Sequence, residues 1–150
     1  MRAIIAYSVR VHTLRLMLLA AALCIPAALC AQTTIIVNDA VNVRSLSAKD
    51  ILDIYTLNRV HWDDGTRISV FDLKGGKTKE SFLAALGMTE EEFKRIWLRK
   101  QFTGKARPPR ALATEEEVID LVSRTPGAIG YVSERPAKNL PNVRIIAKVK

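Results

Sequence analysis

The stretch from Leu46 to Leu73 constrains the fold more than any other part of the chain, because it combines a capped helix, a turn and a strand. Ser47 and Asp50 form a helix-start pair of the capping-box kind. The apolar residues behind that start recur at helical spacing and predict one buried stripe: Ala48, Ile51, Leu52 and Tyr55. The turn residues His61 to Gly65 then lead into an alternating strand, from Arg67 to Leu73.

This strand ends at a glycine-rich loop, Gly75-Gly76-Lys77-Thr78, which is the candidate ligand site. Loops between a strand and a helix are where open α/β folds usually bind ligands. Free backbone amides at a helix N-terminus favour an oxyanion, and Lys77 and Thr78 add a charge and a hydroxyl. The loop is not a P-loop, because the Gly-x-x-x-x-Gly-Lys spacing is absent. An ordinary helix start explains the same residues, so both interpretations stay open.

The first 31 residues have the layout of a secretory signal peptide. Two arginines precede an apolar run from Leu14 to Leu29, a third lies at its start, and this segment contains no acidic residue. Small residues follow at Cys30 and Ala31. We expect cleavage after Cys30 or Ala31 and a periplasmic location, with retention as an N-terminal anchor as the alternative. No second hydrophobic span follows.

Removal of residues 1–31 lowers the formal charge from +8 to +5, because three arginines leave, and it also removes both cysteines. The remaining chain must therefore be stabilised by its core and not by disulfides. Residues 32–150 are long enough for one ordinary domain and too short for two. We predict a single domain over this range.

The remaining pattern predicts the order β, α, β, α, α, α, β, β, which indicates an α/β sheet with helices packed on it. Thr33 to Val37 is a continuous apolar strand of the kind found in buried parallel sheets. Thr89 with Glu92, and Thr114 with Glu117, predict two further capping boxes. The other expectations are a helix from the glycine loop to Leu86, an extended loop from Gln101 to Ala113, a strand from Ala128 to Ser133, and a last strand with Val143, Ile145, Ala147 and Val149 on one face.

A basic run extends from Lys94 to Arg110 without an acidic residue. One interpretation is an anion-attracting surface. The preferred one is that the bases lie at a helix C-terminus, where the macrodipole favours them. Nucleic acid is not an expected partner, because an exported chain is separated from it. Aromatic residues are also not interleaved with the basic residues in a way that would stack bases.

His61, Asp63 and Asp64 suggest a metal or acid/base site, but a turn explains the same residues and no second His remains after export. The chain beyond residue 31 also has no cysteine nucleophile. We expect no catalytic residue, no metal and no cofactor.

Five motifs together resemble the phosphate-binding components of ABC transporters, which are type II periplasmic binding proteins, and above all their short single-domain relatives. They are LSAKDILDIY (46–55), WDDG (62–65), FTG (102–104), PP (108–109) and PGAIGYV (126–132). The resemblance implies a Rossmann-like three-layer lobe with a mixed sheet of four to five strands. It also places the family's phosphate-binding loop on Gly75 to Thr78, where only Gly76 and Thr78 correspond.

These observations predict an exported, non-catalytic solute-binding-like module that binds phosphate or another oxyanion weakly if at all. An ABC transporter or another envelope protein is the expected partner. The alternative is a periplasmic interaction protein that uses the same fold and its basic surface to contact an acidic partner.

Overall fold

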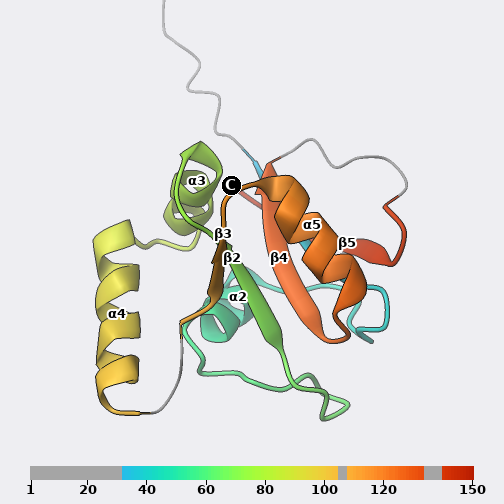
Figure 1. Ribbon diagram of the computed structural model, residues 1–150, viewed down its shortest axis with the longest axis horizontal. Coiled ribbons are helices and arrows are strands. Elements are labelled where there is room, and N and C mark those ends of the chain that lie inside the picture. Colours follow the sequence, from blue (N-terminus) through green and yellow to red (C-terminus); the bar gives the residue numbers. More distant parts are fainter. Residues whose placement is uncertain (1–31, 105–107, 134–139) are drawn as a thin grey trace, which may run out of the picture.

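The computed structural model describes residues 32–104, 108–133 and 140–150, and the predicted signal peptide lies outside these ranges. Its centre is a five-stranded sheet with the strand order β3-β2-β4-β1-β5 (Figure 1). The strands are β1 (Thr33–Asn38), β2 (Ser69–Leu73), β3 (Arg110–Leu112), β4 (Ala128–Ser133) and β5 (Val143–Val149). The helices are α2 (Ala48–Tyr55), α3 (Lys77–Ala85), α4 (Glu90–Phe102) and α5 (Glu115–Arg124). The predicted α/β architecture with a mixed sheet is confirmed.

Strand β1 is buried along its whole length, as the apolar run predicts. The expectation that it is a parallel strand is wrong, because β1 pairs antiparallel with both β4 and β5. The parallel pairs are β2 with β3 and β2 with β4. An unbroken apolar run reports that both faces of a strand are covered, and it carries no information about the direction of the neighbours.

The helices cover the sheet from both sides, with α5 on one face and α2 and α3 on the other (Figure 1). Adjacent residues of β4 show the two layers. Tyr131 stacks on Phe82 of α3 with ring centroids 3.9 Å apart, whereas Gly130 faces α5. Helix α4 stands beside the β3 edge of the sheet. The three-layer arrangement predicted from sequence is therefore present.

The helix starts follow from local side-chain chemistry. Ser47 and Thr89 both form complete capping boxes, as predicted. At the third start, the Thr114 hydroxyl accepts from the Glu117 amide, but the Glu117 carboxylate accepts from the Ala113 amide instead of the Thr114 amide. The predicted third box is thus only half formed.

Two details of the buried faces differ from the expectation. In α2, Ile54 is buried and Ala48 is exposed. In β5, Ile146 is 7% exposed and Ile145 is 44% exposed, so the predicted single face is wrong. The pairing of β1 with β5 shifts between Ile35 and Ile36, and this bulge breaks the alternation of side chains along β5.

The segment from Gln101 to Ala113 is not one extended loop, which corrects a second expectation. Helix α4 continues to Phe102, and Arg110–Leu112 forms the short strand β3 beside β2. A three-residue strand after two prolines has too little alternation to be visible in the sequence.

Within the described residues, no helix combines the length and the apolar character that crossing a bilayer requires.

Gly130 provides a test of the contact between the sheet and α5. An added Cβ at Gly130 would lie 2.5 Å from Val118 Cγ1 and 3.1 Å from Val122 Cγ2. We expect Gly130→Ala to lower the free energy of unfolding by about 1–3 kcal/mol, because overpacking displaces the helix. Urea denaturation followed by circular dichroism measures the change. Gly75→Ala is the control, since nothing lies within 4 Å of its Cβ position, and an equal loss there would contradict the packing argument.

Candidate functional site

Three parallel strands end at one edge of the sheet, the upper edge in Figure 1. Strand β2 leads into the glycine loop and α3, β3 leads into α5, and β4 ends at Ser133. The Lys74 amide donates to the Leu112 carbonyl over 2.9 Å and holds the ends of β2 and β3 together. The carboxyl edge, defined as the Gly75 to Thr78 loop with Glu115 and Ser133, is the position where α/β sheets present ligand-binding groups.

The structure places Gly75, Gly76, Lys77 and Thr78 together at the start of α3. Gly76 is the N-cap residue with φ 97°, a conformation that glycine adopts without strain, and no side chain caps the helix. Gly75, Gly76 and Lys77 are exposed, and Thr78 is half-buried. Their predicted location at a helix N-terminus is correct, and their role as ligand-binding residues stays a prediction.

A carboxylate of the chain itself occupies the donors at this edge. The Thr78 hydroxyl donates to Glu115 Oε1 over 2.6 Å. The Ser133 amide and the Ser133 hydroxyl both donate to Glu115 Oε2 over 2.9 Å. Glu115 is also the first residue of α5, where the helix macrodipole favours a negative charge. Three elements of the fold therefore converge on one internal anion.

This arrangement limits what the edge can bind. A free oxyanion near Thr78 would compete with Glu115 for the same hydroxyl and would be repelled by its charge. Two like charges 4 Å apart repel by about 4 kcal/mol at the effective dielectric constant of a protein surface. The amides of the exposed glycine loop remain the accessible part of the edge.

Sequence reasoning missed Glu115 and Ser133. In the sequence, Glu115 is one of three consecutive acids at a helix start and Ser133 is the last residue of a strand, and neither position indicates a contact between them. Their contacts join residues 37 and 18 positions apart in the chain. No local spacing predicts such a contact, because it depends on the order of the strands.

Beneath this edge lies a buried polar cluster of Asp72, Lys79 and Tyr131. Lys79 Nζ donates to Asp72 Oδ2 over 2.7 Å and to the Leu73 carbonyl over 2.8 Å. The Tyr131 hydroxyl donates to Asp72 Oδ1 over 2.6 Å. Asp72 and Lys79 are only 5% and 6% exposed. The cation of Lys79 is thus already neutralised and is not available to a ligand.

Two tyrosine hydroxyls at this cluster stay protonated. Burial, followed by the nearby Asp72 carboxylate, raises the pKa of both Tyr55 and Tyr131. The Tyr55 hydroxyl donates to the Phe71 carbonyl over 3.0 Å. Both groups therefore act as hydrogen-bond donors inside the core.

The residues of the possible metal site form a turn, as the preferred interpretation predicts. Asp63 pairs with Arg59 over 2.6 Å, and Asp64 Oδ1 accepts from the Thr66 amide over 2.8 Å. Trp62 Nε1 donates to the Gly127 carbonyl over 3.0 Å and joins this turn to the start of β4. In the described part of the chain, no group of three or more metal-ligating side chains is present.

Comparison with solved structures identifies the fold. A putative phosphate ABC transporter substrate-binding protein from Clostridium perfringens, with bound phosphate, superposes with a TM-score of 0.61 at 20% identity and over 78% of this chain. An ABC-type phosphate transport receptor from Vibrio cholerae gives a TM-score of 0.60 at 21% identity over the same share. The chain has the fold of these substrate-binding proteins. The resemblance inferred from its motifs is confirmed at the level of the fold.

The overlap is partial and distant. The matched region covers 45% of the Clostridium perfringens protein and 46% of the Vibrio cholerae protein, so this chain spans about half of their length. No protein-family model and no curated protein sequence matches it.

The buried pair of Asp72 and Lys79 generates a prediction about stability. We expect Lys79→Met to lower the free energy of unfolding by about 3–5 kcal/mol, because it leaves a carboxylate buried without its cation. The double change Asp72→Asn with Lys79→Met should recover most of this loss, since the amide still accepts from Tyr131. Thermal and urea unfolding measure both variants. Equal destabilisation of the single and double variants would show that the lysine acts by packing alone.

Proposed function

We propose that this chain is an exported, non-catalytic solute-binding-like module that binds phosphate or a similar oxyanion weakly, at Gly75, Gly76, Lys77 and Thr78. The main support for this proposal is the start of α3, where a glycine N-cap leaves the first backbone amides of the helix without a side-chain acceptor. It lies at the carboxyl edge of a fold shared with a substrate-binding protein solved with bound phosphate. Lys77 supplies an exposed cation beside these amides.

Two observations support weak binding. Glu115 already accepts from the Thr78 hydroxyl, so an incoming anion gains fewer hydrogen bonds. Gly75, Gly76 and Lys77 are also exposed to solvent. An anion held at this exposed loop remains in contact with water, where charge-assisted hydrogen bonds contribute least.

The proposed export, and with it the proposed envelope partner, is based on the N-terminal segment. Residues 1–31 carry the signal-peptide pattern, and the chain beyond them has no cysteine. We place the module in the periplasm, where an ABC transporter or another envelope protein is the expected partner. Its non-catalytic character is supported by His61, which lies in the exposed turn, apart from the carboxyl edge.

The alternative function is an interaction protein with an acidic partner. Helix α4 supports it, because Arg95 and Arg99 make no salt bridge with another described residue. Lys105 and Arg107, which belong to the same predicted basic run, lie outside the described residues. A pull-down and a phosphate titration with Arg95→Glu and Arg99→Glu variants separate the two functions. The alternative predicts that both variants lose a captured acidic partner, whereas phosphate binding at Gly75 to Thr78 should stay unchanged in both.

Calorimetric titration with phosphate and with sulfate tests the proposed binding. We expect weak heats at millimolar anion for the natural chain. Glu115→Ala should tighten phosphate binding by roughly tenfold, the equivalent of about 1.4 kcal/mol, because it removes a competing anion from the Thr78 and Ser133 donors. Glu116→Ala is the matched control, because it removes the same charge from an adjacent exposed residue.

Absence of heat and of any thermal shift in both the natural chain and Glu115→Ala would rule out phosphate and sulfate as ligands. A gain in Glu116→Ala as large as in Glu115→Ala would show that net charge, and not the occupied donors, controls the affinity.

A further inference from the structure

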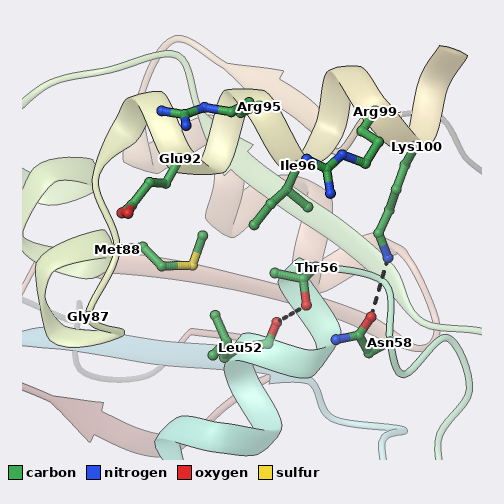
Figure 2. Close-up of a pocket in the computed structure, with 10 residues that line it drawn as sticks. All are labelled: Leu52, Thr56, Asn58, Gly87, Met88, Glu92, Arg95, Ile96, Arg99 and Lys100. Carbon is green, nitrogen blue, oxygen red and sulfur yellow. Dashed lines mark hydrogen bonds between the residues drawn. The ribbon is translucent and has the colours of Figure 1, made fainter.

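A surface cavity lies at the opposite end of α3 from the glycine loop. It is open to solvent, has a volume of about 580 Å³ and lies between α2 and α4, with Gly87 and Met88 at one side (Figure 2). This volume is within the range of small-molecule sites, which is roughly 300–1,000 Å³. The glycine loop is at the amino end of α3, whereas Gly87 and Met88 follow its carboxyl end. The two places are therefore separate candidates.

The inner surface of this α2–α4 cavity is apolar. Leu52 of α2, Met88 of the α3–α4 turn and Ile96 of α4 come from three different elements and converge on the same space (Figure 2). All three are only half-buried, so each still presents apolar surface. A methionine in this position adapts to the shape of what binds beside it.

The rim of the cavity is basic. Arg95, Arg99 and Lys100 line it along α4, and Figure 2 shows the Arg99 guanidinium beside Ile96. Lys100 Nζ donates to Asn58 Oδ1 over 3.3 Å. The guanidinium of Arg99 makes no hydrogen bond or salt bridge with any described residue. The single acid of the lining, Glu92, accepts from the Thr89 amide at the helix cap.

We propose that the α2–α4 cavity binds a small amphiphilic anion, which is an anionic headgroup that carries an apolar chain. The headgroup pairs with Arg99 and Lys100, and the chain covers Leu52, Met88 and Ile96. Exposed cations alone hold a plain anion weakly in water, so the apolar contact must supply much of the affinity. Each buried methylene strengthens binding by roughly fourfold.

This proposal is independent of oxyanion binding at the glycine loop. The two sites use different residues, and inorganic phosphate has no apolar part for the α2–α4 cavity. Phosphate titration therefore tests the first site and alkyl carboxylates test the second.

The test is a titration of the purified chain, in the form that cells produce, with decanoate below its micelle concentration. Nuclear magnetic resonance shifts of backbone amides report the site and the affinity. We expect shifts around Leu52, Met88 and Ile96, roughly 15-fold weaker binding of octanoate, and no comparable binding of decyltrimethylammonium. Decyl phosphate and decanoate should bind alike if the headgroup needs only negative charge.

Four single variants of α4 separate the proposed contacts from general effects. Arg99→Gln and Ile96→Ser should each weaken decanoate binding by about fivefold or more. Lys94→Gln and Leu98→Ser are the matched controls, since Lys94 pairs with Glu90 and Leu98 is 52% exposed, and neither lines the cavity. The controls should bind as the natural chain does. Thermal unfolding verifies that each variant is folded, and the exposed Arg99 position tolerates its change.

Three results would overturn the proposal. One is equal binding of decanoate and decyltrimethylammonium, which would indicate apolar adsorption. Another is equal weakening by the control variants. The third is binding of an oligoglutamate peptide at α4 without binding of decanoate, which would indicate an acidic protein partner instead.

Discussion

The salt bridge between Asp72 and Lys79 connects the end of β2 to the first turns of α3, and the geometry of the carboxyl edge depends on it. Asp72 is held from a second side by Tyr131 of β4, so the cluster spans two strands and a helix. A buried ion pair contributes little net stability compared with apolar residues, because both charges lose their hydration. Its effect here is geometric, since Lys79 Nζ bonds both Asp72 Oδ2 and the Leu73 carbonyl and so ties the start of α3 to the end of β2. The glycine loop connects these two tethered ends.

The predictable features of this protein are those that a few neighbouring residues encode. Ser47 with Asp50 and Thr89 with Glu92 formed their capping boxes, because the partners are three residues apart. The turn at Gly65 and the helix stop at Gly87 both use a positive φ, which glycine supplies. The features that were missed depend on distant parts of the chain. The direction of β1, the bulge in β5 and the contact of Glu115 with Thr78 are all set by which strand lies beside which.

The candidate site illustrates the same division. The loop Gly75 to Thr78 was located correctly, because a strand, two glycines and a helix are consecutive in the chain. Its chemical state was not predictable, since Glu115 reaches Thr78 from another helix and Lys79 is committed to Asp72. A helix start that resembles an anion site in sequence can thus contain its own anion in the folded protein. The comparisons show that the fold is shared with solved substrate-binding proteins, and they do not extend to the charges at this edge.

The two edge strands of the sheet have features that affect pairing with a strand of another molecule. At one edge, β3 has only three residues, follows two prolines and lies beside α4. At the other edge, β5 is paired through a bulge and carries Arg144 and Lys148. Short, bulged and positively charged edges discourage the addition of another strand. Self-assembly by sheet extension is therefore disfavoured, and any partner of this protein is expected to approach through helices or loops.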